Sequence, residues 1–353
     1  MSFLCQPSAS RWGSVSFLPV ELVFIILDGT DPLGVVRFGM ICFGAHEIVV
    51  KFMNDSYNTV TLTRKFFSSD LAEEFQQLQR QTSLVLSGSA ALGFFYRITF
   101  KGANYDLYVH RRHCDKVVAF MLKAGYRYCR LMASQTLYAT SRPYEVSFYF
   151  RSNSYSAKTI CAVHEFVHEN DDSLKVQVIL CLESPIDVLL GFHSTVPMNV
   201  IMHDLAISLY PKATFNLEVN FAKCDDHAPA VIGRHKYTTR GWELIEGSTG
   251  RPDADLHNVK RYIGDHHCWM IRLPALSPIG PSYSSILGHS WILTYPKLNA
   301  GYVIQYGLLS LPKMSEAVCT SKTVVGNWND SMTDWDDTDF VGFVRDLLDL
   351  LPK

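Results

Sequence analysis

The chain has 353 residues, with 32 basic and 34 acidic side chains and a formal net charge of -2. Hydrophobic residues make up 48% of the sequence and charged residues 19%, a composition typical of globular domains that excludes a long disordered chain. The near-neutral charge also excludes a generally basic protein, so binding to nucleic acid or to an anionic membrane would require a local positive patch. At this length we expect about two domains.

The cysteines and the N-terminus both favour an intracellular protein. The nine cysteines are scattered, their number is odd and no two form a CxxC pair, which is typical of reduced thiols rather than of a disulfide framework. The first residues lack the basic segment and apolar run of a signal peptide. The apolar stretches at 17–27 and 33–43 are interrupted by Glu21 and Arg37 and are too short to span a membrane. We therefore expect a soluble protein of the cytoplasm or nucleus that does not bind membranes.

Two or three short helices are predicted at the start of the chain, over residues 14–54. Pro19 and Glu21 suit a first helical turn, where a proline removes no needed donor and an acid complements the helix dipole. Two further helical runs follow at 33–43 and 45–53. The apolar side chains of the first helix fall on one stripe: Leu18, Leu22, Ile25 and Ile26. Helices this short cannot form a stable core alone, so we expect them to pack on a partner or on the rest of the chain.

The opening Leu-Pro-x-Glu-Leu of this segment, with the Ile-Leu pair and the Asp-Pro-Leu turn that follow it, resembles the F-box. The F-box is the three-helix module that docks on the Skp adaptor of cullin ubiquitin ligases, so the resemblance implies a Skp-type adaptor as a partner. It implies these partner-binding residues: Leu18, Pro19, Glu21, Leu22, Ile26 and Leu27. The second half departs from the motif, with small or apolar residues at positions that are usually polar or basic: Gly39, Met40, Phe43 and Gly44. The alternative is a helical cap packed on the rest of the chain.

An α/β pattern begins after a linker and helix at 55–82, and it extends over residues 83–215. We predict short apolar strands and amphipathic helices in alternation, with strands at 84–86, 105–109, 144–150, 160–167 and 175–180 and helices at 90–95, 114–124 and 185–201. The C-terminal extension, 216–353, is mixed, with an acidic stretch at 327–339 and a last helix at 340–351. The expected fold class is therefore α+β, with a helical N-terminal segment, a minimal mixed sheet with helices, and a mixed extension.

A Gly-Ser turn between the first of these strands and its helix is a candidate phosphate-binding site. Gly88 and Ser89 precede the helix, where backbone N–H groups and the helix dipole attract phosphate, and Ser89 is expected to cap that helix in any case. On the next strand Asn104 and Asp106 are two residues apart and therefore point to the same face. The carboxylate of Asp106 is a candidate Mg²⁺ ligand, because two metal ions held by such acids can position a nucleoside triphosphate.

The order of strand, Gly-Ser turn, helix and acidic strand resembles the nucleotidyltransferase superfamily of polymerase-beta-like enzymes. Over about residues 15–275, segments such as LSGSAALGFF, KVQVIL and RHKYTTRGWELI resemble a basidiomycete-type fungal family in which an F-box-like start precedes a nucleotidyltransferase-like domain. The resemblance implies cofactor binding at Gly88, Ser89 and Asn104. In an active enzyme it implies catalysis and metal binding at Asp106, with Mg²⁺ and a nucleoside triphosphate as cofactors.

The sequence departs from this family at two of three metal ligands. Asn104 replaces the first acid of the Asp-x-Asp pair, and Gln177 occupies the inward position of the strand expected to carry the third acid. Neutral amides bind a hard divalent ion weakly, and Glu165 is the one nearby acid that could move in. We therefore predict a degenerate site without a cofactor, in a non-catalytic interaction protein that is a candidate substrate adaptor of a ubiquitin ligase. The alternative is an active Mg²⁺-dependent nucleotidyltransferase acting on a protein, an RNA or a small molecule.

Residues 164–168 spell HExxH, the zinc-binding helix motif of metalloproteases. Here the motif falls on a predicted strand, in which His164 and His168 would be about 13 Å apart, too far to share one zinc ion. We therefore predict that the motif does not bind zinc, and a metalloprotease is the weakest of the alternatives.

Three other clusters of polar residues complete the candidate sites. Arg111-Arg112 is a basic turn between a strand and a helix, and no other basic cluster was found, so nucleic acid is not an expected partner. The segment 265–268, Asp-His-His-Cys, lacks a second pair of metal ligands and is expected to be a turn. A third cluster resembles a segment that follows the core in the fungal family, and it is a candidate for one wall of the cleft, with no role assigned to it: Lys236, Tyr237 and Arg240.

Overall fold

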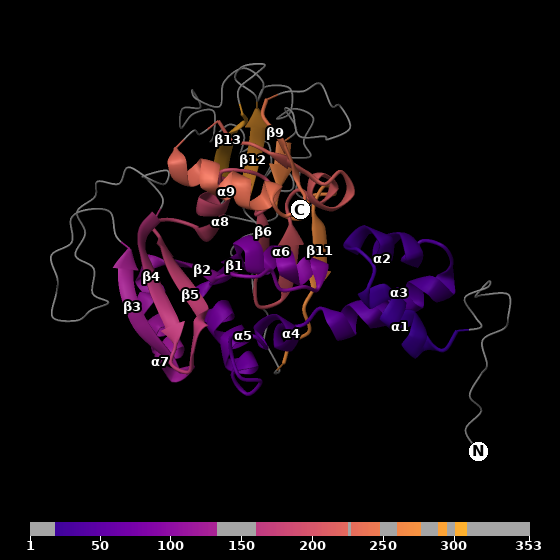
Figure 1. The fold of residues 1–353 in the computed structure, drawn as a ribbon, viewed down its shortest axis with the longest axis horizontal. Helices are drawn as coiled ribbons and strands as arrows, with labels where there is room; N and C mark the ends of the chain where they lie inside the picture. Colours follow the sequence, from indigo (N-terminus) through magenta and orange to yellow (C-terminus); the bar gives the residue numbers. More distant parts are fainter. Residues whose placement is uncertain are drawn as a thin grey trace, which may run out of the picture.

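The computed structural model describes residues 18–132, 160–224, 227–247, 260–276, 289–294 and 301–308. It combines helices with a large mixed sheet, which confirms the α+β class (Figure 1). A unit of three helices lies to one side of the body that contains the sheet. Within the described ranges, no helix is both long enough and apolar enough to cross a membrane.

The three-helix unit consists of α1 (Val20–Asp28), α2 (Pro32–Gly39) and α3 (Phe43–Ser56), close to the predicted positions. Asp31 caps α2 by accepting a hydrogen bond of 2.8 Å from the Gly34 N–H. Side chains from all three helices form a small core: Val23, Leu27, Val35, Ile48, Val49 and Phe52. The unit thus buries part of its apolar surface within itself, whereas we expected helices this short to depend on packing elsewhere.

Hydrogen bonds from Arg97 connect the three-helix unit to the rest of the molecule. It directly follows α6 (Gly88–Tyr96) and has a left-handed backbone conformation, with a φ of 58°. Its guanidinium donates hydrogen bonds to the carbonyl oxygens of Leu27 and Thr30 at the end of α1, and to the Tyr57 hydroxyl at 2.5 Å. The end of α1 is therefore held against the end of α6.

Two helices, α4 (Thr59–Thr63) and α5 (Leu71–Thr82), connect this unit to the sheet. The polar stretch at 55–63 contains α4 because Asn58 and Thr61 form a capping box, in which the Thr61 N–H donates to the Asn58 side chain at 2.9 Å. On α5 three apolar side chains enter the main core: Leu71, Phe75 and Leu78.

An eight-stranded sheet forms the centre of the molecule, in the order β11-β7-β6-β1-β2-β5-β4-β3. Its strands are β1 (Val85–Ser87), β2 (Tyr105–His110), β3 (Tyr126–Met132), β4 (Ile160–His168), β5 (Asp171–Cys181), β6 (Asn199–Ile201), β7 (Leu205–Ser208) and β11 (Trp269–Arg272). The central pair β2 and β5 is parallel, and the other neighbouring pairs are antiparallel. The predicted strands at 84–86, 105–109, 160–167 and 175–180 are confirmed, and β4 and β5 form the expected hairpin.

Two apolar cores cover the two faces of this sheet. The first contains side chains of α5, α6 and α7 (Cys114–Lys123), and the second contains those of α8 (Pro185–Leu190) and the C-terminal strands. Along β2, Leu107 enters the first core and Tyr108 the second, because successive side chains alternate between faces. Asp106 has the parity of Tyr108 and therefore points toward the face of the second core.

The chain after β5 differs from the prediction of a helix over 185–201. The helix α8 ends at Leu190, and β6 occupies the end of the predicted range. Between them, Thr195 accepts a hydrogen bond of 3.1 Å from the Phe221 N–H, and Pro197 cannot donate to a helix. Strand β3 was not predicted. The strand at 144–150, the acidic stretch and the last helix of the prediction lie outside the described residues.

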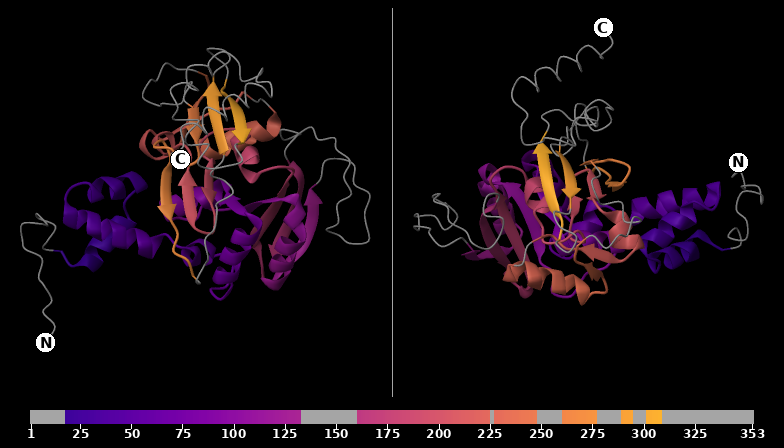
Figure 2. Two further views of the ribbon diagram at one scale, coloured as in Figure 1. Left: turned by 180° about the vertical axis from the view of Figure 1, so that it is seen from behind. Right: turned by 90° about the horizontal axis from the view of Figure 1, so that it is seen from above.

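The C-terminal extension contributes further elements: β8 (Val219–Phe221), α9 (Ala228–Thr238), β9 (Glu243–Ile245), β10 (Lys260–Tyr262), β12 (His289–Thr294) and β13 (Val303–Leu308). Strands β8 and β9 form a parallel pair, and β10, β12 and β13 form an antiparallel sheet. Two short helical turns complete the description, Arg111–His113 and Lys212–Asn216. Both views of Figure 2 show the three-helix unit projecting from the body, away from β12 and β13.

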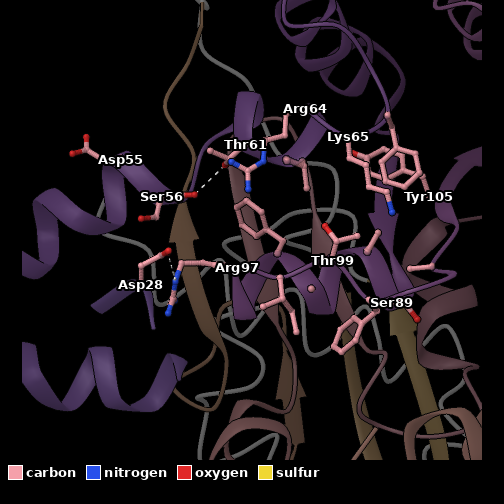
Figure 3. Close-up of a pocket in the computed structure, with 18 residues that line it drawn as sticks. Asp28, Asp55, Ser56, Thr61, Arg64, Lys65, Ser89, Arg97, Thr99 and Tyr105 are labelled. Carbon is pink, nitrogen blue, oxygen red and sulfur yellow. Dashed lines mark hydrogen bonds and ion pairs between the residues drawn. The ribbon is translucent and has the colours of Figure 1, made fainter. Parts of the chain in front are cut away.

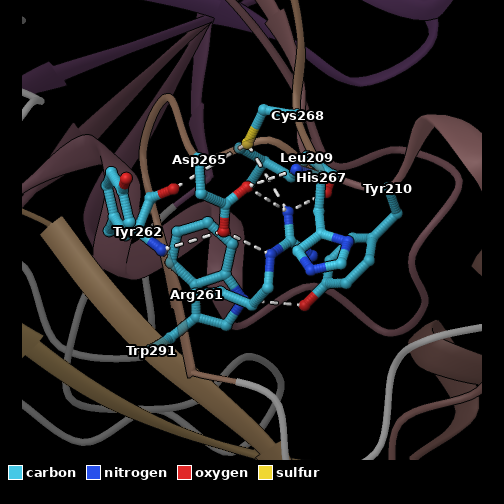
Figure 4. Close-up of polar contacts among 8 residues, drawn as sticks. All are labelled: Leu209, Tyr210, Arg261, Tyr262, Asp265, His267, Cys268 and Trp291. Atoms are coloured by element: carbon cyan, nitrogen blue, oxygen red, sulfur yellow. Dashed lines mark hydrogen bonds and ion pairs between the residues drawn. The ribbon is translucent and has the colours of Figure 1, made fainter. Parts of the chain in front are cut away.

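A buried ion pair holds the turn that follows β10 (Figure 4). The side chains of Arg261 and Asp265 are each 3% exposed, and Nε lies 2.6 Å from Oδ2. Arg261 also donates to the Leu209 carbonyl at 2.8 Å, and Asp265 accepts from the N–H groups of Tyr262 and His267. The prediction of a turn at 265–268 is confirmed.

Candidate functional site

The chain passes from β1 into α6 with no turn between them, and Gly88 makes this passage possible. Its φ is +69°, in the left-handed region that favours glycine. A Cβ at this position would lie 2.8 Å from Oδ2 of Asp106. Ser87 is the register partner of Asp106 in the pairing of β1 with β2. The start of α6 therefore lies directly against the Asp106 carboxylate, and the structure brings these two predicted site residues together.

Asp106 carries an unsatisfied carboxylate. Its Oδ1 atom is buried and has no hydrogen-bond partner among the described residues. Burial raises the pKa of Asp106 to about 6, and the positive charge of Lys236 acts in the opposite direction. A buried carboxylate without a partner lowers stability, so a position that retains one is a candidate functional position.

Two side chains of the segment 236–240 contact Ser89 in the first turn of α6, and a third, Lys236, acts electrostatically on Asp106. Arg240 donates from Nη1 to the Ser89 hydroxyl at 2.9 Å, and the Tyr237 hydroxyl lies 3.3 Å from the same oxygen. Burial lowers the pKa of Lys236, while the negative charge of Asp106 raises it. The segment therefore lies beside the Gly-Ser sequence.

Ser89 does not cap α6, contrary to the prediction. The N-cap position belongs to Ser87, whose hydroxyl donates to the Asn199 carbonyl at 2.6 Å and makes no cap. Because the helix begins at Gly88, the Ser89 side chain is already inside the first turn. A phosphate that contacted this hydroxyl would have to displace Arg240 or Tyr237.

The site provides one carboxylate, that of Asp106, as a ligand for a divalent metal ion. Gln177 on β5 is the register partner of Asp106, so an amide stands where the third acid was expected. Glu165 on β4 is the next partner in the row, roughly 10 Å from Asp106 across two strand spacings. Its Oε2 is paired with Arg130 at 3.3 Å. Among the residues described, no three His, Cys, Asp or Glu side chains are grouped so that they could hold a metal ion.

Asn104 and Phe100 are two further residues near this site. Asn104 lies just before β2, half-buried, and its side chain makes no hydrogen bond within the described part of the chain. Phe100 was not singled out by any motif, but the Arg240 guanidinium lies over its ring, 4.4 Å from the centroid. No sequence signal could have revealed this contact, because the two residues are far apart along the chain.

The HExxH residues lie on β4, as predicted, and not on a helix, so they do not form the zinc-binding helix of a metalloprotease. His164 is buried, and burial lowers its pKa to about 4. Its Nε2 atom lies 3.9 Å from the Cys114 Sγ. The ring of His168 instead packs against Tyr126, with centroids 5.1 Å apart. Both histidine side chains thus pack against other side chains of the fold.

The outer surface of the three-helix unit is a second candidate site. The α1 stripe, which consists of Leu18, Leu22, Ile25 and Ile26, is exposed, and Ile25 retains 69% of its accessible surface. Pro19 and Glu21 are exposed beside it. Leu27 is only 2% exposed in the core of the unit, so its predicted role in partner binding is wrong. The α2–α3 corner exposes further apolar side chains: Met40, Ile41 and Phe43.

A cavity of about 310 Å³ lies where the three-helix unit meets α4 and α6 (Figure 3). We call it the junction cavity. Asp28 and Asp55 stand at one end of it, and Lys65 and Ser89 at the other. Its walls come from segments that are distant in sequence, so no motif could have predicted it.

Comparisons of the chain with protein families, curated proteins and solved structures found no match. The function is therefore inferred from the residues and contacts described above.

Replacing Gly88 with alanine should destabilise the protein by about 2–3 kcal/mol, because a left-handed alanine costs about 1–2 kcal/mol and its methyl group would also collide with Asp106. Gly102 offers a matched control, since its φ is +67° and no atom lies within 4 Å of the Cβ position. Gly102→Ala should therefore show only the backbone cost, about 1–2 kcal/mol. Urea unfolding of both variants measures the difference. Equal losses would contradict the close approach of Gly88 to Asp106.

Proposed function

We propose that this chain is a non-catalytic interaction protein of the cytoplasm or nucleus. Its three-helix unit would dock on a Skp-type adaptor, and the sheet-containing body would be a degenerate nucleotidyltransferase-like domain that recognises a further protein. In this proposal the chain acts as a substrate adaptor of a ubiquitin ligase. The observation that carries it is the exposed α1 stripe, which begins at the Leu-Pro-x-Glu-Leu motif.

The exposure of the α1 stripe supports docking on an apolar partner surface. Burying one isoleucine or leucine side chain contributes about 1.5–3 kcal/mol, and the stripe leaves four such side chains in water. An exposed cluster of this kind is typical of a protein interaction site. The unit already has its own core and a fixed attachment through Arg97, so the stripe is not needed to hold it in place.

The surroundings of Asp106 support the non-catalytic half of the proposal. Two-metal nucleotidyl transfer needs several carboxylates, and here an amide is the register partner of the single acid. The hydroxyl of Ser89 is engaged by Arg240 and Tyr237.

Changing Ile25 to glutamate should abolish co-purification with a Skp-type adaptor, because it places a charge in the centre of the α1 stripe. Ile232→Glu on α9 is a matched control, since the two isoleucines are 69% and 70% exposed. The control should bind as the unchanged chain does. Pull-down of the adaptor with full-length chains measures both, with circular dichroism to verify folding. Failure of the unchanged chain to bind any Skp-type adaptor would refute the proposal.

The alternative is an active Mg²⁺-dependent nucleotidyltransferase, and the contact of Gly88 with Asp106 is the observation that favours it. A nucleotide could also bind at Gly88 and Ser89 without turnover. Transfer of labelled nucleotide that requires Mg²⁺ and is lost in Asp106→Asn would establish the enzyme and overturn the non-catalytic proposal.

A further inference from the structure

The junction cavity is large enough to hold a small ligand. Its volume of about 310 Å³ lies at the lower end of the range of about 300–1,000 Å³ for small-molecule pockets. Its lining extends from Ser89 in the first turn of α6 to Arg97 just after the helix, a distance of about 12 Å. Neither Asp106 nor Lys236 is among the lining residues, so the cavity is separate from the carboxylate of the candidate site.

The charges that line the cavity are not balanced internally. Arg97 is occupied by the carbonyl oxygens at the end of α1 and by Asp28, whose Oδ1 lies 3.7 Å from Nε. Arg64 and Lys65 also line the cavity and are exposed, and neither has an ion pair with another described residue. Asp171 is influenced electrostatically by Lys65 but is outside the cavity and beyond ion-pair distance. The Lys65 Nζ atom lies 5.3 Å from the centroid of the Phe66 ring, so the cavity is lined by two cations that have no carboxylate partner among the described residues.

Further positive character lies at the Lys65 end. Arg240 contacts two residues of the lining, through its hydrogen bond to Ser89 and its position over the Phe100 ring. The first turn of α6, with its positive helix dipole, is at the same end. Figure 3 shows Asp28 and Asp55 at the opposite end together with Arg97, so the carboxylates of the lining are gathered at that end.

We propose that the junction cavity binds an elongated ligand with an anionic head, a phosphate or a carboxylate, held by Lys65 at one end and by Arg64 along the wall. The body of the ligand would pack on the apolar lining residues: Phe94, Ile98 and Phe100. Its other end would carry a hydrogen-bond donor or a positive charge for Asp28 and Asp55. This site goes beyond the proposed docking function and does not depend on it.

Pyrophosphate and citrate, titrated separately into the full chain at low salt and followed by calorimetry, test the two kinds of head group. We expect saturable binding of at least one, and the tighter probe identifies the head. The double variant Arg64→Gln/Lys65→Gln should weaken that binding about tenfold or more, because charge-assisted hydrogen bonds to the anion are lost. Both residues are exposed, so the variant should fold normally.

Two controls separate this site from other sources of anion binding. Lys116→Gln on α7 removes one exposed positive charge elsewhere and should leave the affinity unchanged. Lys236→Gln tests binding beside Asp106 and should also leave it unchanged. The proposal is overturned if neither probe binds, if Lys116→Gln weakens binding as much as the double variant does, or if only Lys236→Gln weakens it.

Discussion

Replacing Arg97 with alanine should destabilise the protein by about 3–5 kcal/mol, because a hydrogen bond to a charged group contributes about 1.5–3 kcal/mol and this side chain makes several. The Arg97 side chain is 6% exposed and donates to the carbonyl oxygens of Leu27 and Thr30 and to the hydroxyl of Tyr57. Tyr57 donates in turn to the Phe95 carbonyl at 2.9 Å. Without the guanidinium, these acceptors at the end of α1 lose their shared donor.

The variant should also loosen the three-helix unit from the sheet before the sheet itself unfolds. Hydrogen exchange of the α1 amides and urea unfolding of the whole chain measure the two effects separately. Arg37→Ala on α2 is the control, since Arg37 is exposed, and it should cost less than about 0.5 kcal/mol. If both variants lost the same stability, Arg97 would not be the attachment that its contacts indicate.

Local signals in the sequence were sufficient for most of the elements. The Asp-Pro turn before α2 and the apolar runs of β1 and β2 determine structure over a few residues, so the sequence could predict them. The prediction of a helix over 185–201 was wrong because residues in its second half pair with segments that are distant in the sequence. Thr195 bonds to the β8 backbone, and β6 fills the position between β1 and β7. Such tertiary contacts override a local helical pattern.

The candidate site was predictable in part for the same reason. Gly88 and Asp106 are brought together by the pairing of two adjacent strands, which a short sequence pattern can indicate. The contact of Arg240 with Ser89 spans a large part of the chain and has no local signature. Gln177 was expected at the inward position of its strand, and the structure makes it the register partner of Asp106.

Helix α6 connects the candidate site, the junction cavity and the three-helix unit. It begins at Gly88 against Asp106, passes along the junction cavity and ends at Arg97, which holds the three-helix unit. Nine residues thus set the position of the candidate site relative to the α1 stripe. A ligand in the junction cavity would contact both parts, since Asp28 of α1 and Ser89 of α6 line it.

Changing Asp265 to asparagine should cost about 3–5 kcal/mol at pH 7, because it leaves the Arg261 guanidinium buried without a counter-charge. The chain contains a matched control in Asp172→Asn. The Arg127–Asp172 pair has the same 2.6 Å separation, but its side chains are 52% and 82% exposed, so its loss should cost less than about 1 kcal/mol. Urea unfolding of the two variants compares a buried with an exposed ion pair at equal distance. Similar losses would show that burial does not determine the contribution of this pair.

The cost of Asp265→Asn should also depend on pH. Burial by itself raises the pKa of Asp265, but the hydrogen bonds and positive charge of Arg261 outweigh it and hold the pKa below its ordinary value. A carboxyl group whose pKa is lowered by folding contributes stability above its unfolded pKa of about 3.9, and that contribution is lost as the pH falls through the folded pKa. The difference in stability between the unchanged chain and the variant should therefore be constant from pH 8 to about pH 5 and should shrink below about pH 4. A difference that stayed constant down to pH 2 would mean that the carboxylate charge contributes nothing, and that shape alone makes Asp265 necessary.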